Sequence, residues 1–257
     1  MKKVLNIVVA LVAFAVLLPS CTAKVQQENP NKVVKTGIDV LESNGFKQLQ
    51  GKKVGLVTNP SGVNNKLVST VDILANAPGV ELVALYGPEH GVRGDIHAGD
   101  KVSDEVDPKT GIPVYSLYGK TRKPTPEMLK DVDAIVYDIQ DNGCRSFTFI
   151  STLGLLMEAA AENGKEVIVL DRPNPLGGNK VEGNIVEPGY FSFVSQFEIP
   201  YLYGLTVGEL AQMLNEEGML KGEKGTNDTI VKCNLTVVPM EGWSRDMVYT
   251  DTRLPWV

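Results

Sequence analysis

The chain has 257 residues, of which 43% are hydrophobic and 22% charged, with a formal net charge of −6. This is the composition of an ordinary globular protein, and it excludes a disordered chain, a collagen and a coiled-coil rod. The acidic balance argues against non-specific binding to nucleic acid, which needs a positively charged surface. We therefore expect no nucleic-acid partner.

Residues 1–20 have the pattern of a secretory signal peptide. Lys2 and Lys3 supply the positive charge, and residues 4–18 are almost continuously apolar but short for a membrane span. The segment ends in LLPSC, where a leucine and a small residue precede Cys21 as in a bacterial lipobox. The pattern predicts cleavage and a lipid on Cys21. An ordinary signal peptide and an uncleaved anchor are the alternatives.

A lipid on Cys21 would place the protein outside the cytoplasm, anchored at the periplasmic face of a membrane. Thr22 follows the cysteine, and the lack of aspartate there favours the outer membrane in a cell with two membranes. Residues 21–35 are polar and are predicted to be a tether. The folded domain is expected over residues 36–257.

Short apolar runs alternate with helical patterns along this domain. Strands are expected at residues 53–58, 80–86, 113–117, 133–138, 166–170 and 231–240. Helices are expected at residues 67–76, 147–163 and 206–215, the second closed by Gly164, and a short helix is expected to begin at Pro126 with Thr125 as its cap. Apolar strands alternating with helices indicate an α/β fold with a Rossmann-like, doubly wound, mostly parallel sheet. Residues 176–204 and 218–229 are Gly-rich and predicted to be loops.

Two cysteines, Cys144 and Cys233, remain in the expected domain. An exported protein can form disulfides, but these residues lie far apart in the sequence. We expect two buried free thiols, with a disulfide as the alternative.

Polar side chains gather where four of the strands end. The clusters comprise Asn59 and Ser61; Glu89, His90 and Arg93; Asp138, Asp141 and Arg145; and Asp171, Arg172 and Asn174. A parallel sheet brings the carboxyl ends of its strands to one rim, where ligands bind. The sequence therefore predicts a site at this rim, although loops at strand ends carry some polar residues in any protein.

Glu89 is the leading candidate for chemistry within these clusters. It lies in a glycine-flanked turn where the backbone can approach a ligand, and a desolvated carboxyl there could serve as a general acid. The alternatives are a solvated loop glutamate and a partner for Arg93. Asp138 and Asp141 could supply a second carboxylate, or they could orient Arg145 and cap the following helix.

Known cofactor motifs are absent from the sequence. Residues 87–94 (GPEHGVRG) do not match G-x-G-x-x-G, and neither a P-loop nor G-x-S-x-G occurs, so no nucleotide cofactor is expected. His90 and His97, with Glu89 and Asp95, could bind a metal, but H-E-x-x-H is missing. We expect neither a metal nor another cofactor.

Four ordered motifs resemble one family. They are VTNPSG at residues 57–62, GPEHGVRG at 87–94, YDIQDNGCR at 137–145 and DRPNPLGG at 171–178. Together they resemble the NamZ-type exo-β-N-acetylmuramidases over roughly residues 36–257. Any one motif alone would be weak, and their order makes the match specific.

The resemblance implies a glycoside hydrolase of cell-wall turnover that releases N-acetylmuramic acid from the non-reducing end of peptidoglycan fragments. It implies a Rossmann-like domain, a smaller C-terminal domain and a site in the cleft between them. The family's motif glutamate falls on Glu89, the candidate acid/base, with Asp138 or Asp141 as a second catalytic group. The implied substrate-binding residues are Asn59, His90, Arg93, Arg145, Asp171 and Asn174. Arg93 or Arg145 could hold the lactyl carboxylate of muramic acid in a bidentate pair.

The chain departs from the family at its end. Residues 251–257 (DTRLPWV) fall within a motif after which family chains continue. We therefore expect the smaller C-terminal domain to be largely absent from this chain. A non-catalytic envelope lipoprotein that binds muropeptides or sugars is the alternative function.

Overall fold

The computed structural model describes residues 33–94, 105–222 and 229–257. The chain divides into two units, Met1–Lys32 and Val33–Val257, and the elements below all belong to the second. The predicted signal peptide, Cys21 and tether residues 21–32 lie outside the described residues, as do Asp95 and His97.

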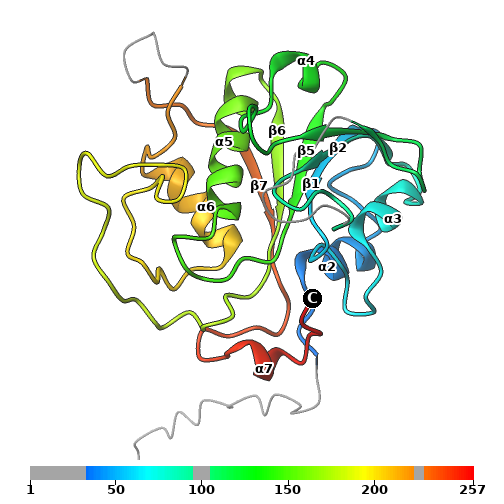
Figure 1. Cartoon of the computed structure of the whole chain (residues 1–257). Helices are drawn as coiled ribbons and strands as arrows, with labels where there is room; N and C mark the ends of the chain where they lie inside the picture. The colour runs from blue at the N-terminus through cyan, green and yellow to red at the C-terminus, as the bar shows by residue number, and fades with distance from the viewer. Residues whose placement is uncertain (1–32, 95–104, 223–228) are drawn as a thin grey trace, which may run out of the picture. The chain divides into compact units, whose positions relative to one another are not determined.

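Seven strands form one sheet in the order β3-β4-β2-β1-β5-β6-β7. They are β1 (Lys53–Thr58), β2 (Glu81–Gly87), β3 (Glu105–Val106), β4 (Pro113–Ser116), β5 (Ala134–Asp138), β6 (Glu166–Leu170) and β7 (Asn234–Val238). All neighbours pair in parallel except β3, which runs antiparallel to β4. The predicted α/β fold with a mostly parallel sheet is confirmed (Figure 1).

Helices cover both faces of this sheet. They are α2 (Gly37–Ser43), α3 (Thr70–Ala75), α4 (Pro126–Leu129), α5 (Phe149–Glu162), α6 (Val207–Glu216) and α7 (Tyr249–Thr252). Figure 1 shows α5 and α6 on one face and α2 and α3 on the other. On β5, Ile135 and Tyr137 pack into the α5–α6 core, whereas Ala134 and Val136 pack into the α2–α3 core. No helix in the described ranges is long and apolar enough to cross a membrane.

Local sequence signals set the ends of several helices. The Thr125 Oγ1 accepts a hydrogen bond of 3.4 Å from the Met128 amide at the start of α4. Thr206 and Glu209 form the predicted capping box of α6, with hydrogen bonds of 3.0 and 3.2 Å. Gly164 has φ +62° just beyond α5. These three predictions are confirmed.

Side-chain hydrogen bonds to the backbone shorten two predicted elements. The strand expected over 231–240 begins only at Asn234, because the Cys233 amide bonds to the Asn215 side chain at 3.0 Å. The helix expected from residue 67 begins at Thr70, because Leu67 adopts φ +63° in a turn held by the Asn64 side chain.

The cysteine prediction is confirmed in its main point, since Cys144 and Cys233 are both free. Cys233 is buried, and its burial raises the pKa of the thiol to about 11. Cys144 is only half-buried, contrary to the expectation that both thiols would be buried.

The predicted tether boundary at residue 35 is wrong for residues 33–35. Val34 is 1% exposed, and its amide donates to the Thr252 carbonyl at 3.1 Å. Lys35 forms an antiparallel bridge with Glu241, with two hydrogen bonds of 3.0 Å. Backbone pairing with a distant segment, which local polarity does not reveal, makes these residues part of the domain.

Helix α2, which the sequence analysis did not predict, begins in close contact with the end of β6. The Gly37 amide donates to the Asp171 carbonyl at 2.7 Å, and a Cβ on Gly37 would lie 2.4 Å from the Asp171 amide nitrogen. Both partners are backbone, so the clash can be relieved only by moving α2 away from the sheet.

We expect Gly37→Ala to lower the free energy of unfolding by about 1–3 kcal/mol, as overpacking does in other cores. Urea denaturation followed by circular dichroism measures this value. Ser43→Ala, an exposed change in the same helix, is the control and should stay within about 0.5 kcal/mol of the parent. Equal losses in the two variants would contradict the packing argument.

Candidate functional site

Four neighbouring strands, β2, β1, β5 and β6, end at the same edge of the sheet. The four predicted polar clusters therefore lie along one rim.

The ends of β1 and β5 are joined by side-chain hydrogen bonds. The side chain of Asn59 accepts hydrogen bonds from the Ser61 amide at 3.0 Å and the Ser61 hydroxyl at 2.5 Å. The same hydroxyl accepts from the Gln140 amide at 3.0 Å, and Thr58 donates to the Asp138 carbonyl at 2.8 Å. These bonds join the ends of β1 and β5.

Glu89 lies in the tight turn that follows β2. His90 has φ +74° and Gly91 φ +73°, so the backbone reverses directly after the glutamate. A Cβ on Gly87 would lie 3.2 Å from the Gly91 Cα, which shows how closely the turn folds back onto the strand. Glu89 itself is half-buried, so its carboxylate is reachable from solvent.

Tyr118 contacts this carboxylate from the neighbouring strand end. Its hydroxyl donates to Glu89 Oε1 at 2.9 Å, because β2 and β4 pair in parallel with Gly87 opposite Ser116. The hydrogen bond to Glu89 raises the pKa of Tyr118 above its ordinary value. The sequence analysis left Tyr118 unassigned, although its place directly after a predicted strand was the signal that could have identified it.

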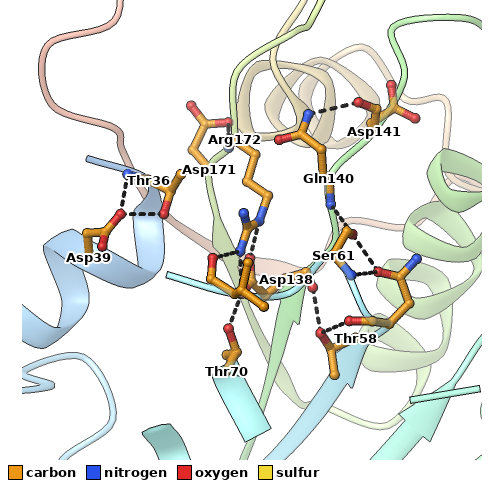
Figure 2. Close-up of polar contacts among 12 residues, drawn as sticks. Thr36, Asp39, Thr58, Ser61, Thr70, Asp138, Gln140, Asp141, Asp171 and Arg172 are labelled. Carbon is orange, nitrogen blue, oxygen red and sulfur yellow. Dashed lines mark hydrogen bonds and ion pairs between the residues drawn. The ribbon is translucent and has the colours of Figure 1, made fainter. Parts of the chain in front are cut away.

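Asp138 and Arg172 form a buried ion pair between the ends of β5 and β6 (Figure 2). Arg172 Nε and Nη2 donate to the two carboxylate oxygens at 2.6 and 2.9 Å, and the Thr70 hydroxyl donates to Oδ2 at 2.5 Å. Asp138 is 0% exposed and Arg172 is 4% exposed. The bidentate geometry satisfies both oxygens of the aspartate.

Asp141 is buried in a different way. One carboxylate oxygen accepts from the Gly143 amide at 2.7 Å and from the Tyr203 hydroxyl. The other, Oδ1, is buried and has no hydrogen-bond partner in the described part of the chain. Burial raises the pKa of Asp141 above its ordinary value, opposed by the hydrogen bond from Tyr203. The side chain therefore keeps one buried carboxylate oxygen without a described hydrogen-bond partner.

Asp171 and Asn174 hold the backbone that follows β6. Asp171 accepts from the Gly208 amide at 2.8 Å and the Thr206 hydroxyl at 3.1 Å, which fixes the start of α6. Asn174 donates to the Leu205 carbonyl at 3.0 Å. Both side chains are buried, and these contacts orient the loop before α6.

Burial raises the pKa of Asp171 from 3.8 to about 6, although hydrogen bonds, first among them that from the Gly208 amide, oppose it. The folded state therefore holds this proton more tightly than the unfolded chain. The associated stability is complete below pH 3.8 and falls as pH rises through about 6, by at most about 1.4 kcal/mol per pH unit.

Asp171→Asn should remove this pH dependence, because the amide does not titrate. The measurement is the difference in unfolding free energy between parent and variant from pH 4 to pH 7. We expect the parent to lose stability relative to the variant across that range. Asp131→Asn, at an exposed position, is the matched control and should track the parent, so parallel curves for Asp171→Asn would contradict the assignment.

The two arginines proposed for the lactyl carboxylate already bind protein groups. Arg93 donates to Asp107 at 2.9 and 3.0 Å and to Asp72 at 3.0 Å, and the hydrogen bond from Arg93 lowers the pKa of Asp107 to about 2. Arg145 donates to the carbonyls of Asn184 and Ile199 at 2.8 and 2.5 Å. Its Nε is buried without a partner among the described residues.

A metal site is not evident in the part of the chain that the structure describes, where no three histidine, cysteine or acidic residues cluster. His97 and Asp95 lie outside it. His90 remains a predicted substrate-binding residue that the contacts above do not test.

Comparison with known proteins identifies relatives of this chain. A relative from Bacillus subtilis (strain 168), described as peptidoglycan β-N-acetylmuramidase NamZ, is 55% identical over 224 residues, covering 87% of this chain and 51% of the relative. Two crystal structures of DUF1343 family proteins from Bacteroides fragilis also match. The first is 66% identical to this chain, and the match covers 87% of this chain and 54% of the crystallised chain, with a TM-score of 0.80. The second is 30% identical, and the match covers 85% of this chain and 55% of the crystallised chain, with a TM-score of 0.70.

The chain thus spans about half the length of the relatives it matches. The family model that describes the N-terminal part of the exo-β-N-acetylmuramidase NamZ matches residues 54–257, which includes all the helices except α2 and every strand apart from Lys53, the first residue of β1. The chain therefore belongs to the NamZ exo-β-N-acetylmuramidase family.

Proposed function

We propose that this protein is a glycoside hydrolase that releases N-acetylmuramic acid from the non-reducing end of peptidoglycan fragments. The observation that carries the proposal is the 55% identity to a relative described as a peptidoglycan β-N-acetylmuramidase. The reachable carboxylate of Glu89 at the carboxyl edge of a parallel sheet supports it, since ligands bind at this edge in such folds.

Glu89 is the proposed general acid/base. Cleavage of a glycosidic bond needs an acid that protonates the leaving oxygen, and a half-buried glutamate can reach that oxygen. Its hydrogen bond with Tyr118 fixes one carboxylate oxygen and leaves the other oxygen for the substrate.

A second group must meet the positive charge that develops on the sugar ring. Of the two predicted aspartates, we propose Asp141 for this role, because its Oδ1, although buried, has no described partner. Both carboxylate oxygens of Asp138 accept hydrogen bonds from Arg172, so we propose that Asp138 has a structural role and holds the ends of β5 and β6 together. The proposed sugar-contacting residues of the rim remain Asn59, His90, Arg93, Arg145, Asp171 and Asn174.

The test is hydrolysis of a chromogenic β-N-acetylmuramic acid glycoside by the full chain, with the corresponding N-acetylglucosamine glycoside as the matched comparison. We expect dye release from the first substrate and little from the second. Binding of the sugar without any release would overturn the catalytic proposal and indicate a carbohydrate-binding protein.

We further propose that the protein is exported and anchored to a membrane through a lipid on Cys21. The basic start, the apolar stretch of residues 4–18 and the LLPSC sequence support this. Cys21→Ser should abolish incorporation of labelled fatty acid and release the protein from the membrane fraction. Ser20→Ala keeps the cysteine and is the control. Unchanged fractionation of Cys21→Ser would contradict the proposal.

A further inference from the structure

Arg122 is an exposed arginine on the loop between β4 and α4. Its guanidinium carbon lies 4.3 Å from the centre of the Phe193 ring, which is the geometry of a cation–π contact. Within residues 33–94, 105–222 and 229–257 it makes no ion pair or hydrogen bond. Stacking on the ring holds the planar group in place and leaves its N–H donors available.

This distinguishes Arg122 from the other arginines at this side of the sheet. Arg93 binds two carboxylates, Arg145 binds two main-chain carbonyls, and Arg172 binds Asp138. Arg93 and Arg172 would have to leave a carboxylate before they could bind a ligand, and the Nε that Arg145 leaves without a described partner is buried. Arg122 has no such bond to break among the described residues.

Arg122 lies on the same loop as a residue that contacts the candidate acid. Tyr118, four residues earlier on the same loop, donates to Glu89 at 2.9 Å. The hydrogen bond to Glu89 raises the pKa of Tyr118, and the positive charge of Arg122 opposes that rise. The loop between β4 and α4 therefore carries both Tyr118, which contacts the candidate acid, and Arg122, which is held on Phe193.

A guanidinium binds a carboxylate through two parallel hydrogen bonds, and an aromatic ring beneath it favours that fixed orientation. Muramic acid differs from glucosamine by a lactyl ether that ends in a carboxylate. We propose that Arg122, held on Phe193, binds this lactyl carboxylate and makes the site specific for muramic acid. The inference rests on the proposed function and names the specificity residue of that same site.

The test compares binding of three sugars to the full chain by isothermal titration calorimetry. They are N-acetylmuramic acid, its methyl ester and N-acetylglucosamine. We expect the parent to prefer the acid over the ester by about 10- to 100-fold, the range of a charge-assisted hydrogen-bonded pair. Arg122→Gln should lose that preference and bind the ester as the parent does.

Two further variants separate charge from geometry. Arg122→Lys keeps the charge without the planar fork and should retain only part of the preference. Phe193→Leu keeps Arg122 but removes the aromatic ring beneath it, and should also weaken the preference for the acid over the ester. Lys120→Gln, an exposed residue of the same loop, removes one charge and should leave all three affinities unchanged.

The outcomes separate this inference from the proposed function. A parent that hydrolyses the muramic acid glycoside while Arg122→Gln keeps the full preference for the acid overturns the role of Arg122 alone. A parent that binds acid and ester equally, or binds neither, also overturns it. Absence of hydrolysis together with the expected binding pattern overturns the catalytic proposal and supports the role of Arg122.

Discussion

Glu89→Gln is expected to reduce hydrolysis of a β-N-acetylmuramic acid glycoside by about 10²- to 10⁴-fold, the usual contribution of a general acid/base. Glutamine keeps the size of the side chain and can still accept the hydrogen bond from Tyr118, so the turn after β2 should remain folded. It cannot give a proton to the leaving oxygen. The measurement is kcat/KM on the chromogenic glycoside, alongside the thermal midpoint of unfolding.

Glu81→Gln is the matched control for this variant. Glu81 is exposed at the opposite end of the same strand, so the same change is made away from the rim. Its kcat/KM should equal that of the parent. If Glu89→Gln retained activity within a factor of two of Glu81→Gln, the assignment of Glu89 as acid/base would be wrong, whatever the substrate.

The second large effect is expected from Asp138→Ala. This change leaves the guanidinium of Arg172, only 4% exposed, without its carboxylate partner. Breaking a buried ion pair by removing one partner costs about 3–5 kcal/mol, because the remaining charge stays buried without compensation. Since the total stability of a domain is about 5–15 kcal/mol, urea denaturation should show a large fall in the midpoint.

An exposed ion pair provides the control for Asp138→Ala. Lys232 and Glu216 are joined at 2.7 Å but are 55% and 65% exposed. Glu216→Ala should cost no more than about 1 kcal/mol, since water screens surface charges. If the two variants lost similar stability, the Asp138–Arg172 pair would not be the structural tie that its burial indicates.

The Asp138–Arg172 pair also bears on catalysis. Thr70 and the Val63 carbonyl bind the same two side chains, so the loops after β1, β5 and β6 meet at this pair. A variant that folds but loosens the pair should therefore lower activity without removing a reacting group. If the pair only holds the loops together, a change that restores the stability of such a variant should restore its activity as well. If Asp138 or Arg172 takes part directly, activity should stay low when stability is restored.

The sequence by itself determined the elements whose stabilising contacts are local. The capping box of α6, the cap of α4 and the glycine after α5 all act within about four residues, so they can be recognised from spacing alone. The buried apolar runs of β5 and β6 likewise require cover on both faces, which indicates a parallel sheet. The sequence also predicts that the four motifs at the strand ends lie together, because parallel strands of one sheet end at the same edge.

Only the tertiary structure decided which polar groups pair with each other. Asp138 is hydrogen-bonded to Thr70, 68 residues away in the sequence, and to Arg172, 34 residues away. Glu89 is hydrogen-bonded to Tyr118, 29 residues away. No local pattern encodes these distances, because they depend on the order β4-β2-β1-β5-β6 in the sheet. The same order gives Arg93 its two carboxylate partners and leaves Arg122 stacked on a ring with its donors available. An arginine's availability is therefore a property of packing, and the sequence can only supply the candidates.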